Sequence, residues 1–289
     1  MTFHATTGMP GPPGDTRPVL LTGASGKLGV ALAARLFALG WRLRLTDRAP
    51  FPGAIADGSS FEAADLNDAA ALQRLARGCR AIVHLGGLVE YGSFEAVIGP
   101  NMRGTYHVYE AARMAGCRVI YASSNHVVGF HERPDLDASN GSANLGADCT
   151  MRPDSYYGIS KVVGEMLARF FWDRNGVESV LLRIGSCFEE PTDERMLATW
   201  LSRADLARLV VRSIEAPTTG CAVVWATSRN AASWWGADDR ARIGWEPQDS
   251  ADAWAGKVPP KGNAVARRFQ GGGFCSVDYT PEAQRPARA

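Results

Sequence analysis

Short apolar runs alternate along this chain with longer segments in which apolar residues recur every three or four positions. The first pattern predicts buried strands and the second predicts amphipathic helices. The predicted strands are 18–23, 41–47, 80–87, 117–124, 177–186 and 221–227, and the predicted helices are 27–40, 67–78, a long one within 97–116, 154–176 and 203–217. Because the strands are nearly continuous in apolar residues and alternate with helices, they indicate an α/β fold with a parallel sheet covered on both faces. Asn67 is the predicted cap of its helix.

This alternation ends near residue 228, where the chain becomes rich in Trp, Gly and Pro. The segment 1–16 lacks the apolar core of a signal peptide and is expected to be a disordered leader. Residues 17–227 are expected to form the main domain, and 228–289 to wrap around it as a small C-terminal part.

Composition narrows the function classes. The chain of 289 residues carries a net charge of +1, so no basic field argues for nucleic acid or an anionic membrane. No apolar run is long enough to span a bilayer. The six cysteines show no short paired spacing, so neither a metal site nor a disulfide framework is expected. A reduced, cytoplasmic setting is the expectation.

The first candidate site is a glycine-rich turn between the first strand and the first helix. In "TGASGKLG", glycines at 23, 26 and 29 permit a tight turn and close approach of a pyrophosphate to the helix N-terminus. The alternative is a plain structural turn. The residues assigned to cofactor binding here are Gly23, Ser25, Gly26, Lys27, Leu28 and Gly29.

Asp47 ends the second strand, about 20 residues after this loop. A carboxylate there can bind both ribose hydroxyls of NAD and repel the extra phosphate of NADP. The cofactor is therefore predicted to be NAD, although Arg48 beside it would soften the preference and a loop-capping aspartate is the alternative.

Further cofactor contacts are expected along the same sheet edge. Asp65 could reach the adenine, and "HLGG" ends the third strand with small residues. His84 in that motif is expected to be packed, and a helix cap is the alternative for Asn101. The assigned residues are Asp65, Leu66, Leu85, Gly86, Gly87 and Asn101.

The stretch "SYYGISK" carries the candidate chemistry. Only Tyr157 precedes Lys161 by four residues, so it shares a helix face with that lysine and Tyr156 does not. Lysine occurs at only four positions, 27, 161, 257 and 261, in a chain rich in arginine. This favours a task that needs a compact, tunable charge. A chance match on an amphipathic turn is the alternative.

Ser124 ends the fourth predicted strand and is the third candidate. The Lys161 ammonium is expected to lower the pKa of the Tyr157 phenol, so that the phenolate acts as general base on a substrate hydroxyl. Ser124 would hold the substrate oxygen, Lys161 would also reach the nicotinamide ribose, and NAD would accept the hydride.

These motifs together resemble the extended short-chain dehydrogenase/reductase superfamily over roughly residues 18–227. The resemblance implies a Rossmann-type doubly wound sheet and a homo-oligomer paired through the long helices at 97–116 and 154–174. It also implies that 17–227 bind NAD and catalyse, with 228–289 contributing to the substrate region.

A narrower resemblance, to the NAD-dependent uronate dehydrogenases, rests on "ASSNH", "RIGSCFEEP", "RMLATW", "VVW", "WW" and "RRFQGG". It implies oxidation of D-glucuronate and D-galacturonate at the anomeric carbon to an aldarolactone. Tyr157, Lys161 and Ser124 are then catalytic, and the residues around the sugar are Ser124, Asn125, His126, Ser186 and Arg195. Val89 departs from the hydroxyl residue that relatives often carry there.

Purely structural roles remain open for these residues. His126 could simply pack, Ser186 could cap a turn, and Arg195 could lie on the surface. The tryptophans at 200, 234 and 235 are expected to be packing, and "RRFQGGGF" could cover the cofactor or meet another subunit. Two other functions also stay open: a nucleotide-sugar epimerase or dehydratase, and a non-catalytic cofactor-sensing protein of the same fold.

Overall fold

A single parallel sheet organises the chain. The structure, a computed structural model, describes residues 14–89, 92–134 and 145–284, so the predicted leader lies almost wholly outside the described residues. The strands are β1 Val19–Thr22, β2 Leu43–Asp47, β3 Ser60–Ala63, β4 Ala81–His84, β5 Arg118–Ser124, β6 Ser179–Ile184 and β7 Cys221–Ala226. Their order, β3-β2-β1-β4-β5-β6-β7, is that of a doubly wound sheet with every described pair parallel, which confirms the predicted fold class.

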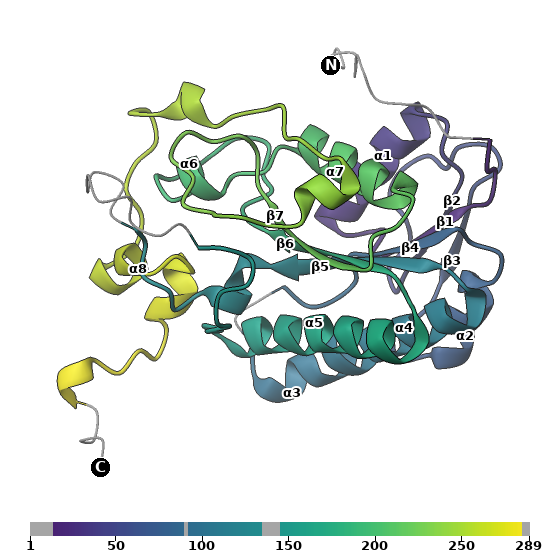
Figure 1. The fold of residues 1–289 in the computed structure, drawn as a ribbon, viewed down its shortest axis with the longest axis horizontal. Coiled ribbons are helices and arrows are strands. Elements are labelled where there is room, and N and C mark those ends of the chain that lie inside the picture. Colours follow the sequence, from purple (N-terminus) through teal and green to yellow (C-terminus); the bar gives the residue numbers. More distant parts are fainter. Residues whose placement is uncertain (1–13, 90–91, 135–144, 285–289) are drawn as a thin grey trace.

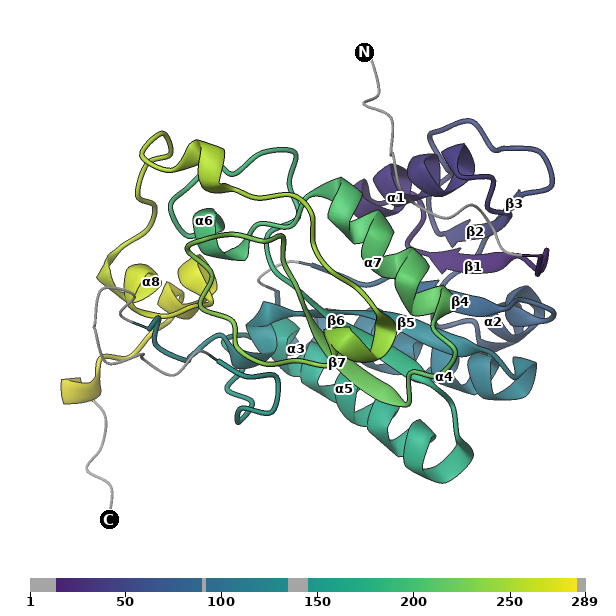
Figure 2. The ribbon, with the colours of Figure 1, turned by 45° about the horizontal axis from the view of Figure 1, so that its top comes forward.

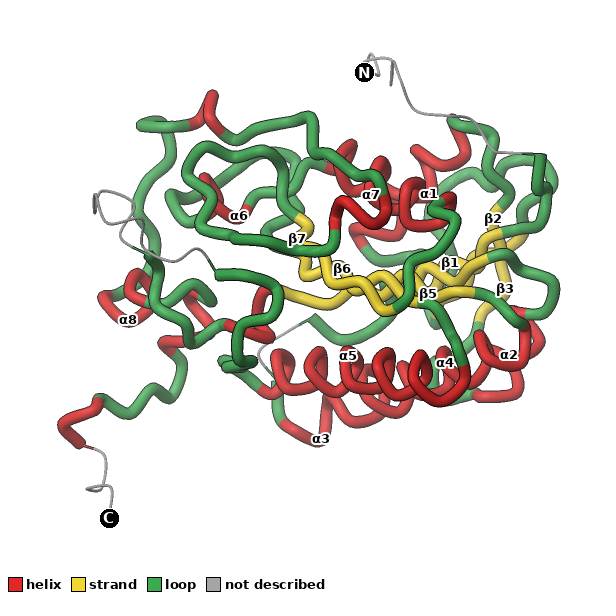
Figure 3. The backbone as a smooth tube through the Cα atoms, viewed as in Figure 1, coloured by secondary structure: helices red, strands yellow, loops and turns green. Residues whose placement is uncertain are grey.

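Helices cover both faces of this sheet. They are α1 Lys27–Ala38, α2 Ala69–Ala76, α3 Phe94–Val97, α4 Gly104–Ala115, α5 Tyr156–Asn175, α6 Met196–Thr199, α7 Arg203–Glu215 and α8 Ala264–Arg268. Figures 1 and 2 show α1 and α7 on one face and α2, α4 and α5 on the other, and Figure 3 shows the strands as the layer between them. Among the described residues, no helix is both long enough and apolar enough to cross a membrane.

The central strands are buried on both faces, which explains why helices cover both sides of the sheet. The side chains of β1, β4 and β6 are buried along their whole length, and alternate residues enter two different hydrophobic clusters, one under α1 and α7 and one under α2, α4 and α5. Strands that bury both faces need apolar residues at every position, which is the pattern that made them recognisable in the sequence.

The chain crosses from one side of β1 to the other, so β1 and β4 flank the switch point where doubly wound sheets bind ligands. The carboxyl ends of the strands face the C-terminal segment. In Figure 1, β5 points toward α8 and the segment that follows it. A side chain of that segment, Gln270, donates to the Asn125 carbonyl just beyond β5, at 2.6 Å.

Two local predictions were wrong or incomplete. The edge strand β3 was missed because only one of its four residues is even partly buried, so it has no apolar pattern to detect. The cap of α2 is Asp68, whose carboxylate accepts from the Ala71 amide at 3.0 Å. The Asn67 side chain instead turns back to Asp65, at 2.9 Å.

A buried ion pair joins α5 to the sheet. Arg183 on β6 and Glu165 on α5 are each 1% exposed and meet through two hydrogen bonds of 3.0 and 2.9 Å. Glu165 also accepts from the Ser123 hydroxyl on β5 at 2.5 Å, and the Arg183 guanidinium lies 5.0 Å from the centre of the Trp225 ring on β7. Because Tyr157, Lys161 and Glu165 are spaced four residues apart, one face of α5 carries both the catalytic candidates and this anchor.

Replacing Arg183 by Met should destabilise the protein by about 3–5 kcal/mol, because Glu165 would remain buried without a charged partner. The double variant Arg183→Met/Glu165→Leu should regain much of that stability, since it removes both charges. The free energy of unfolding in urea measures both. As a control, Arg74→Met breaks an exposed pair with Glu62 and should leave the unfolding midpoint almost unchanged. A single variant as stable as the parent protein would contradict the assigned role of the pair.

Candidate active site

The glycine loop is built so that backbone packs on backbone. A Cβ on Gly23, whose φ is +70°, would lie 2.6 Å from the Gly86 nitrogen, and one on Gly29 would lie 2.2 Å from the Gly23 oxygen. Helix α1 begins at Lys27, its N-cap Gly26 provides no side-chain hydrogen bond, and its first turn has no acidic residue. Its amides are therefore free for an anion, and the loop fits the pyrophosphate of a dinucleotide.

The two predicted acidic contacts both bind nearby backbone. Asp47 accepts from the Ser25 amide at 3.1 Å and from the Ala49 amide at 3.3 Å. It therefore ties the glycine loop to the end of β2 at the carboxyl edge of the sheet. Asp65 accepts from the Asn67 amide at 2.8 Å, and these hydrogen bonds lower the pKa of the Asp65 carboxyl.

The end of β4 holds a packed histidine. His84 has no exposed surface, and its Nδ1 and Nε2 lie 2.7 Å from the Thr22 hydroxyl and 3.1 Å from the Thr105 hydroxyl. Burial lowers the pKa of His84 to about 3, helped by the charge of Lys161, so its ring is neutral. The neighbouring glycines leave room for other groups, since a Cβ on Gly86 would lie 2.9 Å from the Leu66 side chain.

Asn101 is not a helix cap. It lies inside a π-helical turn, Ile98–Arg103, and is 1% exposed. Its amide exchanges two hydrogen bonds with the Leu88 backbone, at 2.7 and 2.9 Å, and donates to the Ser160 hydroxyl at 2.9 Å. Asn101 therefore joins the loop after β4 to α5. Its contact on the helix, Ser160, lies between Tyr157 and Lys161 in the sequence.

Ser124, Tyr157 and Lys161 come together at the end of β5. All are buried, at 4%, 5% and 3% exposure, whereas Tyr156 is 48% exposed. Ser124 lies close enough to the Tyr157 phenol to lower its pKa. The Lys161 ammonium lies 5.6 Å from the centre of the Tyr157 ring and donates to the Ala122 carbonyl at 2.7 Å. The helix register thus places Tyr157, not Tyr156, beside the serine and the lysine.

The expected pKa of the tyrosine was wrong for the chain alone. Burial raises the pKa of Tyr157 to about 12, although the Ser124 side chain works in the opposite direction. Burial likewise lowers the pKa of Lys161 to about 8. The phenol and the ammonium are both removed from water, and this removal disfavours the charged form of each.

The predicted sugar contacts surround the same point. Arg195, just before α6, donates to the Gln270 carbonyl at 2.6 Å and to the Ser186 hydroxyl at 3.3 Å. An arginine only donates, so the Asn125 amide turns its oxygen to the guanidinium, at 2.5 Å. Ser186 also pairs with the Thr199 hydroxyl at 2.9 Å. The departure at Val89 is a side chain that is 63% exposed.

His126 is the remaining predicted contact. Its Nδ1 lies 2.7 Å from the Asp154 carboxylate, and its ring stacks on Phe274 with the centres 4.3 Å apart. The ring also meets Tyr157 edge-on, at 5.8 Å.

Sequence reasoning missed three residues of this site: Asp154, Gln270 and Phe274. Asp154 and His126 are 28 positions apart, and Gln270 lies 145 positions from Asn125, so no local spacing links them. The usable signal was the run of glycines in "RRFQGGGF", which marks close approach of backbone.

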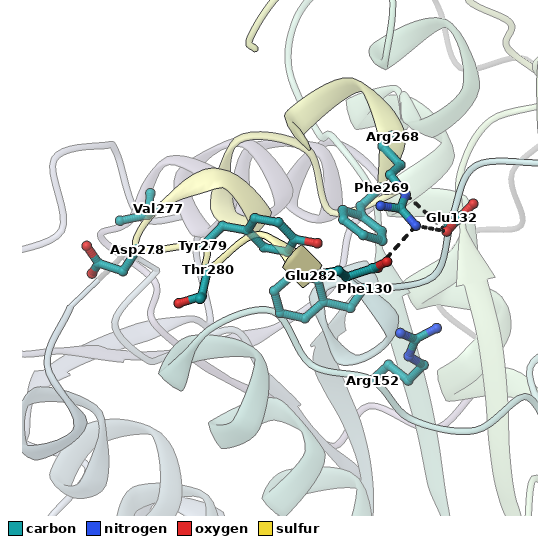
Figure 4. A pocket seen from close by; sticks show the side chains of 10 residues that line it. All are labelled: Phe130, Glu132, Arg152, Arg268, Phe269, Val277, Asp278, Tyr279, Thr280 and Glu282. Carbon is teal, nitrogen blue, oxygen red and sulfur yellow. Dashed lines mark hydrogen bonds and ion pairs between the residues drawn. The ribbon is translucent and has the colours of Figure 1, made fainter. Parts of the chain in front are cut away.

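The predicted tryptophans are packing residues: Trp200, Trp234 and Trp235 are 4–7% exposed. A cavity of about 480 Å³ lies between the C-terminal segment and the stretch around Phe130 and Arg152. Figure 4 shows its aromatic and charged lining, with Arg268 held between Glu132 and Glu282. None of the predicted site residues lines it, so this cavity is separate from the candidate active site.

In the described part of the chain, no group of three or more His, Cys, Asp or Glu is arranged to hold a metal. All six cysteines are free thiols.

The sheet order, the glycine loop and the buried tyrosine–lysine pair define a dinucleotide-binding protein of the Rossmann class. The chain belongs to the NAD dependent epimerase/dehydratase family, whose profile matches residues 19–243. It is 41% identical over 261 residues to a uronate dehydrogenase of Pseudomonas syringae pv. tomato, covering 89% of this chain and 92% of that one. Its identity to a uronate dehydrogenase of Agrobacterium fabrum is also 41%, with 89% and 96% covered.

Solved structures of uronate dehydrogenases have the same fold as this chain. A uronate dehydrogenase from Agrobacterium tumefaciens, solved as a mutant with NAD, has a TM-score of 0.82 and 40% identity, with 90% of this chain and 97% of that one covered. A glucuronic acid dehydrogenase from Chromohalobacter salexigens has a TM-score of 0.83 and 38% identity, with the same coverage. The resemblance to the uronate dehydrogenases is thereby confirmed.

Lys161→Met should raise the stability of the cofactor-free protein at pH 7 by roughly 1–2 kcal/mol while abolishing activity. The pKa of Lys161 in the native state is about 8, below the ordinary 10.5, so the buried ammonium destabilises the native state at pH 7. Between about pH 8 and 10.5 the unfolded chain binds more protons, so the stability of the unsubstituted protein rises through that window. The variant should lack this rise.

Melting temperatures at pH 7 and pH 9.5 measure the difference between the two proteins. A variant destabilised equally at both pH values would show that Lys161 is a structural residue and not a buried charge retained for chemistry.

Proposed function

We propose that this chain oxidises D-glucuronate and D-galacturonate at the anomeric carbon, with NAD as hydride acceptor, and releases the aldarolactone. The identity to uronate dehydrogenases over most of the chain supports the substrate class and the cofactor. The assignment of individual residues is argued from their geometry.

The observation that carries the substrate assignment is Arg195. It is partly buried, and among the described residues no carboxylate forms an ion pair with it, although Asp193 and Asp154 act on it through space. Burial lowers the pKa of Arg195 to about 10, and repulsion from Arg133 adds to this shift. A buried cation without an anion is costly, and a planar guanidinium matches a carboxylate. The carboxylate of a uronate fits this place, and a neutral sugar does not supply one.

The reaction follows from the other residues. Ser124 hydrogen-bonds to the anomeric hydroxyl, and Tyr157 removes its proton. NAD supplies the hydride acceptor for the hydrogen on the same carbon. Lys161 holds its charge against the Tyr157 ring, and favours the phenolate that this step requires. Asn125, His126 and Ser186 bind ring hydroxyls.

The glycine loop and Asp47 would hold the NAD. Asp47 ends β2 with its carboxylate anchored to the loop, and it disfavours the additional phosphate of NADP. The other assigned residues, at 48, 65, 66, 85, 86, 87 and 101, follow the same carboxyl edge of the sheet.

We also propose a homo-oligomer that pairs through α4 and α5. Large apolar side chains are exposed there: Tyr106, Met114, Met166 and Phe170 are 44–59% exposed. A reduced, cytoplasmic location fits the six free thiols.

Tyr157→Phe should lower kcat for D-glucuronate by about 100-fold or more, the scale of losing a general base, while NAD binding is retained. Tyr156→Phe is the matched control, because that ring is half exposed and packs only against Phe94 among the described aromatic rings. Steady-state kinetics and NAD titration by calorimetry measure the two effects. Equal losses in both variants would refute the assignment of Tyr157.

Arg195→Ala should lower kcat/KM for D-glucuronate and D-galacturonate by about 2–4 kcal/mol, roughly 30- to 1000-fold, because a desolvated carboxylate loses its partner. Activity on glucose and galactose should change much less, and that smaller change measures the loss of the Ser186 and Gln270 contacts. The readout is NADH absorbance with NAD and each of the four sugars.

The same assay tests the competing functions. An epimerase recycles its cofactor, so NADH would not accumulate, and a cofactor-sensing protein would bind NAD without turnover. An even loss of activity on all four sugars would show that Arg195 does not bind the uronate carboxylate.

A further inference from the structure

We infer that Asp154 is a positioning residue for His126: it fixes the proton of the neutral ring on Nδ1, so that Nε2 is presented to the substrate as a hydrogen-bond acceptor. The kinetic consequence of this inference rests on the proposed function, whereas the position of the proton does not.

The contact itself is short and enclosed. Asp154 Oδ2 lies 2.7 Å from His126 Nδ1, and the side chain of Asp154 has no exposed surface, while that of His126 is 16% exposed. An ionised carboxylate only accepts hydrogen bonds, so the hydrogen between these atoms belongs to Nδ1. The neutral ring then carries its lone pair on Nε2, the tautomer choice that a hydrogen bond to the other nitrogen imposes.

Two distant glycines make room for this carboxylate. A Cβ on Gly129 would lie 1.9 Å from Asp154 Oδ2, and one on Gly271 would lie 2.0 Å from it. Neither position needs glycine for its backbone, since φ is −52° at Gly129 and −68° at Gly271. Space for the carboxylate therefore requires glycine at both positions, in segments more than 140 residues apart, and at Gly271 a Cβ would also lie 2.8 Å from Cys275 Sγ.

Two aromatic contacts also hold the ring in place. Phe274 stacks on one face of His126, with an interplanar angle of 24°, and Tyr157 meets the ring edge-on. His126 begins directly after Asn125, whose carbonyl is held by Gln270. With Nδ1 committed to Asp154, Nε2 is the ring atom left to bind a sugar hydroxyl beside Tyr157.

Support of α5 does not explain the arrangement. Asp154 precedes the helix, where a carboxylate is favourable, and its Oδ1 accepts from the Ser155 hydroxyl at 2.9 Å. However, Ser155 already caps the helix by accepting from the Gly158 amide at 3.0 Å. Neither role needs the second oxygen of Asp154 to reach His126.

Charged and titratable groups around the pair are few. Cys275 lies 3.7 Å from Asp154 Oδ2, its pKa is raised chiefly by burial, and it stays a thiol. Tyr157 is protonated in the chain alone, and Arg195 interacts with Asp154 only through space. The Asp154 carboxylate is thus the one anion in direct contact with the His126 ring among the described residues.

The test has two independent parts. In the first, ¹⁵N-histidine spectra of the cofactor-free protein at pH 8 report the tautomer of each of the five histidines, and His126→Gln assigns the signal. The expected result is a neutral His126 with its proton on Nδ1. In Asp154→Asn the proton should move to Nε2 in at least a large fraction of molecules, because the amide can donate to Nδ1. A proton on Nε2, or on both nitrogens, in the unsubstituted protein overturns the inference.

In the second part, Asp154→Asn should lower kcat/KM for D-glucuronate by roughly 10-fold, the scale of one lost substrate hydrogen bond, with the KM for NAD unchanged. Asp173→Asn, at an exposed aspartate on α5, is the matched control and should match the parent protein. Unchanged kinetics together with an unchanged tautomer in Asp154→Asn overturn the inference. If the parent protein does not oxidise uronates, the proposed function fails, and the tautomer of the parent protein still decides the inference.

Discussion

The buried pair of Glu165 and Arg183 fixes the relation between α5 and the sheet on which the rest of the site depends. Glu165 lies one turn beyond Lys161 and two turns beyond Tyr157, and it binds both Arg183 on β6 and Ser123 on β5. Ser123 is the neighbour of Ser124. One carboxylate therefore sets the register between the helix that supplies the tyrosine and lysine and the strand that supplies the serine. An apolar contact could hold these elements together, but it would not set their register with the directionality of paired hydrogen bonds.

A second constraint acts on the substrate side, where backbone segments from distant parts of the chain meet. Gln270 binds the Asn125 carbonyl with its side chain and Arg195 with its own carbonyl, so one residue of the C-terminal segment connects two predicted sugar contacts. Gly129 and Gly271 let that segment approach closely enough to enclose Asp154. The C-terminal segment is thus part of the wall of the site as well as a cover for the sheet.

The predictability of each part follows from the range of the interactions that determine it. Strands buried on both faces and amphipathic helices produce local sequence patterns. The fold class, the glycine loop and the position of Tyr157 on the buried face of its helix were predicted from such patterns. The edge strand β3 buries too little to leave a pattern. The role of Asn101 depends on the loop at Leu88 and on Ser160, and the site residues Asp154 and Gln270 act on partners 28 and 145 positions away. The raised pKa of Tyr157 also could not be predicted, because burial is a property of the folded chain.

The charges of the free site explain why its residues are poorly stabilised without ligands. Lys161 and Arg195 are both cations whose pKa values are lowered by burial, and neither forms an ion pair in the described part of the chain. Asp193 and Asp154 act on Arg195 only through space, and Asp154 is hydrogen-bonded to His126. The phenol of Tyr157 is held neutral by the same burial. In the proposed reaction, a uronate would bring an anion to Arg195, and ionisation of Tyr157 would bring one to Lys161. The site is therefore arranged for the charges of the reacting complex, and the cost of that arrangement falls on the free protein.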